Sequence, residues 1–355
     1  MKNKSWFLVV SISLLALLLA VGGITYLVDP YFHYRAPMKG LSYKVEKASY
    51  INDGISRNFD YNAMITGPSM TSGFKMEEAD ALFEKNFVRI TYLGEGFYRI
   101  GKNVRRALES NDKLDLIIWS IDPIWYVTDV EWEGYDTYPD YMLNDNVWDD
   151  VNYLLNGQVF VKDTIPEIVR TMEGIPAEDL DMCAHTEAGN KEVALSRYQR
   201  SEKQNKQVTE EETKALQEAL QRNIEGNIIS VVKENPDVTF YFFIPPLSIL
   251  WWDDLNQISK ATLLRRIDLE QRVIEMLLPY ENVKLFSFED NTDIVCNLDL
   301  YSDTIHYSEE VNSYMLKEMK CGHHLLTQEN YTEYLDNIRA FYSNYNYDQL
   351  FLNTD

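Results

Sequence analysis

Cysteine is scarce in this chain of 355 residues, which holds only Cys183, Cys296 and Cys321. The three form no C-x-x-C pair, and none of them begins a zinc-binding pattern. An odd and sparse set argues against a disulfide framework, although one bridge stays open for a domain in an oxidising space. Metal binding needs three or four converging ligands, and the neighbouring His323 and His324 fall short of that number. We therefore expect neither a metal nor a cofactor.

Basic residues are also few. The chain has 33 Lys and Arg against 56 Asp and Glu, which gives a net charge of −23. Nucleic acid is bound chiefly by neutralising its phosphates with Lys and Arg, so this charge excludes nucleic acid as a partner. The same charge argues against electrostatic attraction of the main body to an anionic membrane surface.

One long run without charge stands at the N-terminus. Trp6–Val28 spans 23 residues after Lys2 and Lys4, and a helix of that length, about 34 Å, crosses a bilayer core. The two lysines predict an inside N-terminus and an extracytoplasmic main domain on a single-pass anchor. The alternative is a cleaved signal peptide, for which Ala20-Val21-Gly22 offers a weak cleavage site.

The remainder shows short apolar runs that alternate with helical segments. The runs that predict strands are Tyr61–Thr66, Phe87–Tyr92, Leu114–Ile121, Val238–Ile244 and Val283–Phe288. The segments that predict helices are Tyr98–Ser110, 206–234, Ile258–Leu278 and a last helix capped by Ser308. This alternation predicts a three-layer α/β/α fold with a mostly parallel sheet, in addition to the N-terminal transmembrane helix.

The expected domain layout follows from these segments. We expect an anchor at 1–28, a juxtamembrane segment at 29–60, an α/β domain at 61–325 and a C-terminal tail at 326–355. An acidic and aromatic stretch at about 123–205 interrupts the α/β pattern. It is interpreted either as an insertion that forms a cap or groove wall, or as a second lobe without a direct role.

Ser69 stands where an apolar strand gives way to a helical segment. Ligands of open α/β sheets bind at the carboxyl ends of strands, and Gly67 allows the sharp turn that exposes a serine hydroxyl there. Backbone N–H groups at such a turn can stabilise an oxyanion. Taken alone, Ser69 is better explained as a helix cap.

Asp303 and His306 supply what a nucleophilic serine needs. A histidine takes the hydroxyl proton near neutral pH, and a carboxylate fixes the imidazole tautomer. Both groups come from one loop before the final helix, which can face the Ser69 turn. The three residues together predict a Ser-His-Asp triad.

These motifs resemble the SGNH/GDSL hydrolase superfamily. There, a G-x-S motif follows the first strand and a D-x-x-H motif precedes the last helix; here they read Gly67-Pro68-Ser69 and Asp303-Thr304-Ile305-His306. The terminal block NLDLYSDTIHYSEEVN and the segment Tyr241–Ser248 resemble membrane-anchored members that modify cell-envelope polymers, namely the D-alanyl-lipoteichoic acid biosynthesis protein D family and polysaccharide O-acetyltransferases. The resemblance implies an SGNH-hydrolase-like domain over about 60–325.

The resemblance also implies oxyanion donors. Gly96 matches the glycine of the second block, with Gly94 as the alternative. Where the family has an asparagine after the third strand, this chain has Asp122, which is no hydrogen-bond donor when ionised. The sequence therefore leaves backbone N–H groups, from Ser69 and a glycine, as the expected oxyanion hole.

The function implied is that of a serine-dependent O-acyltransferase or esterase acting through an acyl-serine. Its expected partners are an envelope polysaccharide or other acyl-bearing polymer and a membrane-bound acyl-transfer partner. The alternative is a non-catalytic, membrane-anchored scaffold of envelope polymer assembly. The incomplete third block favours the scaffold, and the intact Ser, His and Asp favour the enzyme.

Overall fold

A computed structural model describes residues 2–45, 48–134, 139–182 and 189–352. The chain divides into two compact units, each formed by separate stretches of sequence. Unit 1 comprises Met1–Asp60 and Tyr135–Cys183, and unit 2 comprises Tyr61–Gly134 and Ala184–Asp355. Of the segment 123–205 that interrupts the α/β pattern, the middle part thus belongs with the N-terminal residues, and both ends belong with the sheet.

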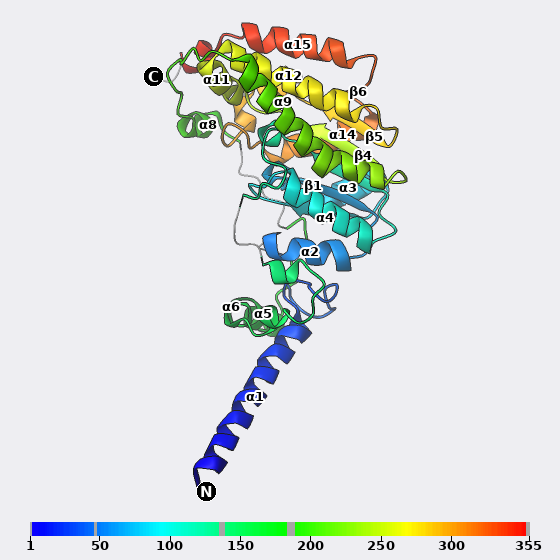
Figure 1. Ribbon diagram of the computed structural model, residues 1–355, viewed down its shortest axis with the longest axis vertical. Helices are drawn as coiled ribbons and strands as arrows, with labels where there is room; N and C mark the ends of the chain where they lie inside the picture. Colours follow the sequence, from blue (N-terminus) through cyan, green and yellow to red (C-terminus); the bar gives the residue numbers. More distant parts are fainter. Residues whose placement is uncertain (1, 46–47, 135–138, 183–188, 353–355) are drawn as a thin grey trace. The chain divides into compact units, whose positions relative to one another are not determined.

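Unit 2 is built on a six-stranded sheet with the order β2-β1-β3-β4-β5-β6. Figure 1 labels β1, β4, β5 and β6 of this sheet. The first five strands are parallel, and only β6 runs antiparallel, beside β5. The strands are β1 (Ala63–Gly67), β2 (Phe87–Thr91), β3 (Leu116–Ser120), β4 (Thr239–Ile244), β5 (Val283–Ser287) and β6 (Leu325–Leu326). β1 to β3 are buried along their whole length, as their continuous apolar character requires of strands covered on both faces.

Helices cover both faces of this sheet. On one face α3 packs against α14, and on the other α12 packs against α9, α11 and α15, while α4 packs against α9 and α10. The helices of unit 2 are α3 (Met76–Phe83), α4 (Phe97–Ser110), α8 (Lys191–Arg197), α9 (Glu210–Ile224), α10 (Ser230–Glu234), α11 (Ile249–Ile258), α12 (Lys260–Leu277), α13 (Thr292–Val295), α14 (Glu309–Cys321) and α15 (Tyr331–Asn344). The predicted α/β/α class with a mostly parallel sheet is therefore confirmed.

Shorter helical turns join these elements. In unit 2 they are the 3-10 turns η1 (Ser69–Thr71), η2 (Pro123–Trp125), η6 (Leu298–Leu300) and η7 (Tyr347–Phe351), and the π turn η5 (Glu225–Ile229) between α9 and α10. In unit 1 they are the 3-10 turn η3 (Asp140–Met142) and the π turn η4 (Phe160–Thr164).

The order of the strands creates a switch point at β1. The chain passes from β1 to β2 on one side and then crosses back to β3 on the other. In doubly wound sheets the crevice outside the carboxyl ends of the strands at such a point is where ligands bind. Ser69 follows β1 directly, so the fold places it at this crevice.

Some elements differ from the expectation. β6 has only two residues, too few for a period to show in the sequence. The predicted helix Ile258–Leu278 is in fact α12, preceded by the separate α11, because Ser259 is extended and caps α12 through Thr262 N. Ser308 stands at the N-cap position of α14, but its side chain caps no backbone N–H and donates to Glu310 instead.

Unit 1 contains the long N-terminal helix and several short ones. They are α1 (Lys2–Val28), α2 (Ala48–Asn58), α5 (Val151–Leu154), α6 (Gly157–Val159) and α7 (Ile165–Met172). Ser5–Val28 is long and apolar enough to cross a membrane, and none of its most apolar window is buried inside the protein. By length and composition it is a membrane span or a signal sequence.

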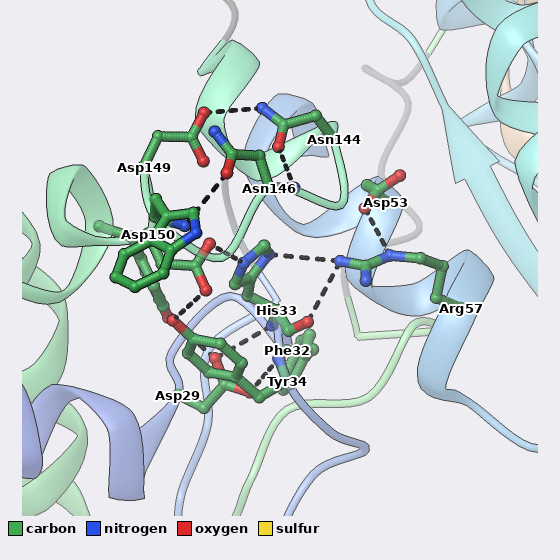
Figure 2. A network of polar contacts seen from close by, with 12 residues as sticks. Asp29, Phe32, His33, Tyr34, Asp53, Arg57, Asn144, Asn146, Asp149 and Asp150 are labelled. Carbon is green, nitrogen blue, oxygen red and sulfur yellow. Dashed lines mark hydrogen bonds and ion pairs between the residues drawn. The ribbon is translucent and has the colours of Figure 1, made fainter.

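A polar network lies beyond the end of α1 (Figure 2). The buried His33 accepts at Nδ1 from Arg57 at 3.3 Å and donates from Nε2 to Asp150 at 3.1 Å. Asp29 accepts from the backbone N of His33 at 3.0 Å and from the hydroxyl of Tyr153 at 3.0 Å. The interior of unit 1 at this point is therefore held by hydrogen bonds and ion pairs.

Candidate active site

The turn after β1 requires its glycine. Gly67 has φ +155°, and a Cβ atom there would lie 2.6 Å from Thr71 Cγ2 and 2.8 Å from Ser120 Cβ. No side chain fits this space, so the chain can turn closely past the end of β3 only with glycine. Ser69 is then the first residue of η1 and is partly exposed.

Helix α14 also holds the turn that carries Ser69. The buried Asn312 donates from Nδ2 to the carbonyl oxygen of Met70 at 3.0 Å. Within the turn, Thr71 Oγ1 donates to Pro68 O at 2.8 Å. The position of Asn312 within a helix pattern gives no sign in the sequence of this contact with a residue 242 positions away.

Three side chains form a continuous line of hydrogen bonds at this turn. Ser69 Oγ lies 2.8 Å from His306 Nε2, and His306 Nδ1 lies 2.7 Å from Asp303 Oδ2. Because a carboxylate can only accept, Nδ1 carries a proton and Nε2 is left to accept the proton of Ser69. The imidazole is thus held in the tautomer that can act as a base toward the serine.

Asp303 is held in its charged form. Burial acts to raise its pKa, but hydrogen bonds from the His306 side chain and from two backbone N–H groups outweigh burial and lower the pKa below its ordinary value. The two backbone donors are Ile305 N at 2.8 Å and His306 N at 2.7 Å, both to Oδ1. An ionised carboxylate that accepts from Nδ1 stabilises the imidazolium that forms when the histidine takes a proton.

The loop that carries Asp303 and His306 is fastened to the exit of β4. Ser248 Oγ donates to Thr304 O at 2.7 Å, and Tyr301 donates from its hydroxyl to Pro246 O at 2.7 Å. The loop is also closed at its own base, where Ser302 N donates to His306 O at 2.9 Å. The segment Tyr241–Ser248, which contains the end of β4 and its exit, therefore positions the histidine loop.

Residues just before and within α8 pack on the same loop. Asn190 N donates to Tyr301 O at 3.0 Å, and Arg197 donates to Ser302 O at 3.2 Å. A Cβ atom at Gly189 would lie 2.3 Å from the carbonyl oxygen of Asp299, so the backbones approach too closely for any side chain. Part of the segment at 123–205 thus supports the loop of His306.

Asp122 lies at the end of β3, beside β1, and is almost completely buried. Burial raises its pKa to about 7, although the charge of His306 and a hydrogen bond from Ser120 act to lower it. At neutral pH the carboxyl group is therefore protonated in a substantial fraction of molecules. The expectation that Asp122 offers no donor holds only for its ionised form, because the protonated acid has an O–H group.

The two candidate oxyanion glycines lie in the loop after β2. Tyr92 N donates to Gly67 O at 2.9 Å, which joins the start of this loop to the Ser69 turn. Gly94 is in the left-handed region, with φ +67°, and Gly96 is the N-cap residue of α4. A Cβ at Gly96 would lie 3.2 Å from the ring of Trp132.

The remaining histidines and cysteines form other contacts. His323 pairs with Glu318 at 2.8 Å, and His324 lies 3.3 Å from Asp290. Across the described residues no group of three or more His, Cys, Asp or Glu side chains could hold a metal ion. Cys296 and Cys321 are free thiols, and Cys183 lies outside the described residues.

Comparisons with known proteins add little to this geometry. No protein-family model matches the chain, and no curated protein matches it. A solved structure from Streptococcus pneumonia, provisionally described as a platelet activating factor, covers 82% of this chain and 92% of its own, at 13% identity and a TM-score of 0.37. At these values the similarity assigns no role to this chain.

Proposed function

We propose that the chain is a serine-dependent O-acyltransferase or esterase that acts on a cell-envelope polysaccharide or related polymer through an acyl-serine intermediate. The observation that carries this proposal is the line of hydrogen bonds from Ser69 through His306 to Asp303. A serine hydroxyl is a poor nucleophile until a base takes its proton, and this arrangement supplies the base and the group that orients it.

In the first step Ser69 Oγ attacks the carbonyl carbon of the acyl donor while its proton passes to His306 Nε2. The carbonyl π electrons move onto oxygen to form a tetrahedral oxyanion. When this intermediate collapses, the bond to the leaving alkoxy oxygen breaks, and His306 returns the proton to that oxygen. The products are a free alcohol and an ester on Ser69.

In the second step a sugar hydroxyl or water attacks the acyl-serine, and His306 takes its proton. Collapse returns the electrons to Ser69 Oγ, which is reprotonated by His306. A sugar hydroxyl gives a transferred ester, and water gives a free acid. Both outcomes use the same three residues, so the proposal covers transfer and hydrolysis together.

The oxyanion needs donors placed where its charge develops. We assign this role to the backbone N–H groups of Ser69 and of Gly96, with Gly94 as the alternative. The contact between Tyr92 and Gly67 supports this assignment, because it holds the beginning of the glycine loop against the Ser69 turn.

The proposed location is the extracytoplasmic face of the cell membrane, with α1 as an uncleaved anchor. The charge pattern before the span supports this orientation. A membrane-bound acyl-transfer partner would supply the acyl group at that face. Protease added to spheroplasts is expected to digest the body of the protein, and a mature N-terminus near residue 22 would instead indicate a cleaved signal peptide.

Labelling with a fluorophosphonate probe tests the proposed chemistry, since the probe reacts with activated serines without requiring the substrate. We expect labelling of the full chain, loss of labelling in Ser69→Ala and His306→Ala, and retention in Ser196→Ala, whose exposed serine on α8 is the matched control. Hydrolysis of a chromogenic acetate ester should fall roughly 10⁴-fold or more in both triad variants.

The scaffold alternative predicts a different result. A folded chain whose Ser69 does not react with the probe, and whose Ser69→Ala variant leaves the acyl content of purified envelope polymer unchanged, would overturn the enzymatic proposal. Circular dichroism and thermal unfolding of each variant separate a lost nucleophile from a lost fold.

A further inference from the structure

The segment formed by η4 and α7 directs polar side chains inward. On α7 the side chain of Glu167 is only 3% exposed, and burial raises its pKa to about 9. Thr164, just before α7, is fully buried as well. Helices on the surface of a water-soluble protein direct apolar residues inward and polar residues outward. Here Thr164 and Glu167 are instead part of the interior.

The outer side of the same helices is apolar. Trp148 is 86% exposed and Met172 is 82% exposed. Between them the exposed apolar residues recur at helical spacing, as Val151 and Leu155 along α5 and as Val161, Ile165 and Val169 along η4 and α7. We call these seven residues the apolar stripe. A set of exposed apolar residues of this size marks a contact with a protein or a membrane.

The position of the stripe along α1 favours the membrane. α5 and η4 pack against α1, and a Cβ at Gly22 would lie 3.2 Å from Leu155 Cδ2. Gly22 precedes the end of the span at Val28 by six residues, or about 9 Å along a helix. Helices that lie in a membrane interface bury their apolar side about 5–10 Å deep, which is the depth at which α5 meets the span.

We propose that α5, η4 and α7 lie in the membrane interface at the C-terminal end of α1, with the apolar stripe inserted among the acyl chains of that leaflet. The inference rests on α1 crossing the bilayer and is independent of the proposed chemistry at Ser69. It is also independent of which side of the membrane this leaflet faces.

Apolar contact rather than charge drives this insertion. Around the start of α5 the chain is acidic, with Asp145, Asp149 and Asp150 close to Trp148. Attraction to anionic lipid needs Lys and Arg clusters, which this region does not present. The insertion is therefore expected to be equally deep in neutral and in anionic bilayers.

A groove between α1 and α5 is suited to the same lipid environment. It has a volume of about 700 Å³ and is lined mainly by apolar residues of both elements, among them Leu15, Leu19, Val151 and Leu155, with Tyr26, Tyr34 and Asp150 as polar members. Leu15 and Leu19 belong to the span, so the groove opens at the depth of the hydrocarbon. Acyl chains of the surrounding lipid are the occupants that match its lining.

Site-directed spin labelling of the full chain in phospholipid vesicles tests the proposal. In a background with the three native cysteines changed to serine, single cysteines are introduced as Trp148→Cys, Val161→Cys and Met172→Cys. Leu15→Cys serves as the control inside the span, and Glu218→Cys on α9 serves as the exposed control. The accessibility of each label to oxygen and to a water-soluble nickel chelate is then measured.

Labels on the stripe are expected to follow the Leu15 control, with collisions with oxygen exceeding those with nickel, and the Glu218 label is expected to show the reverse. If the label accessibilities are equal in phosphatidylcholine vesicles and in vesicles that contain phosphatidylglycerol, the result agrees with apolar insertion. The proposal would be overturned if labels on the stripe collided with nickel more than with oxygen, as at Glu218→Cys, while the label at Leu15→Cys still showed exposure to lipid. Stripe labels shielded from both reagents would also overturn it, because they would indicate a contact with a second copy of the chain.

Discussion

Ser248 donates a hydrogen bond of 2.7 Å to the carbonyl oxygen of Thr304, across 56 residues of sequence. Ser248 is fully buried and directly precedes α11, at the exit of β4. Thr304 lies between Asp303 and His306 in the loop that meets Ser69. The central sheet therefore sets the position of the histidine through a side chain that touches none of the reacting groups.

Replacing this positioning serine should weaken activity more than stability. Ser248→Ala removes one hydrogen bond, which contributes about 1 kcal/mol to the free energy of unfolding. We expect that small loss in thermal unfolding together with a clear fall in kcat for a chromogenic ester, because the loop of His306 is less well held. Ser248→Thr should restore kcat, and Ser196→Ala should leave kcat unchanged. An unaltered kcat in folded Ser248→Ala would contradict the positioning role.

Asp303→Asn tests the tautomer of His306. An amide at this position no longer compels Nδ1 to carry the proton, so kcat is expected to fall by up to on the order of 10⁴-fold, with the fold retained.

Asp303→Asn should also change how the free energy of unfolding depends on pH. Because the pKa of Asp303 in the folded protein lies below its ordinary value of 3.8, its charge stabilises the fold above that value, and this contribution is lost as the pH falls further. In Asp303→Asn the free energy of unfolding should therefore decrease less steeply as the pH falls below that value.

Asp122 should limit activity on the alkaline side. Its pKa is raised to about 7 by burial, so the group gains a negative charge near His306 as the pH rises through that value. Negative charge there opposes the developing oxyanion, and we expect kcat/KM of the wild type to decline above about pH 7. Asp122→Asn stays neutral and should lose this decline. A profile of kcat/KM against pH that is unchanged in Asp122→Asn would show that another group is responsible.

Glu167 should make unit 1 less stable in alkali. Its pKa is raised from 4.5 to about 9 when folded, so the folded state keeps a proton that the unfolded state releases between these values. The free energy of unfolding therefore decreases as the pH rises across this window. In Glu167→Gln that decrease should be reduced by several kcal/mol, at about 1.4 kcal/mol for each pKa unit. Urea unfolding at several pH values in detergent micelles measures it, with the exposed Glu173→Gln as control.

The local pattern of the sequence was sufficient to predict much of the architecture. Apolar runs between helical segments predicted the ends of β1 to β5 to within two residues, because a strand buried on both faces must be apolar along its whole length. The expected D-x-x-H loop and G-P-S turn also lie together, since Ser69 follows β1 at the switch point of the sheet. β6 was not predicted because its two residues are too few to show an alternating pattern.

The sequence by itself determined that Ser69, Asp303 and His306 were present, in turns able to expose them, and that one segment was long and apolar enough to span a membrane. Only the tertiary structure decided their distances, the burial that shifts the pKa of Asp122, and the contacts of Ser248, Tyr301 and Asn312 that hold the two turns. It also decided which side of α5 and α7 faces outward. Helical spacing shows that each helix has two sides, but the side that faces inward is set by the packing of α5 against α1 and, for α7, by the hydrogen bond from Lys44 N to Glu167. These properties depend on groups far apart in the chain, and their energies arise only when folding brings those groups into contact.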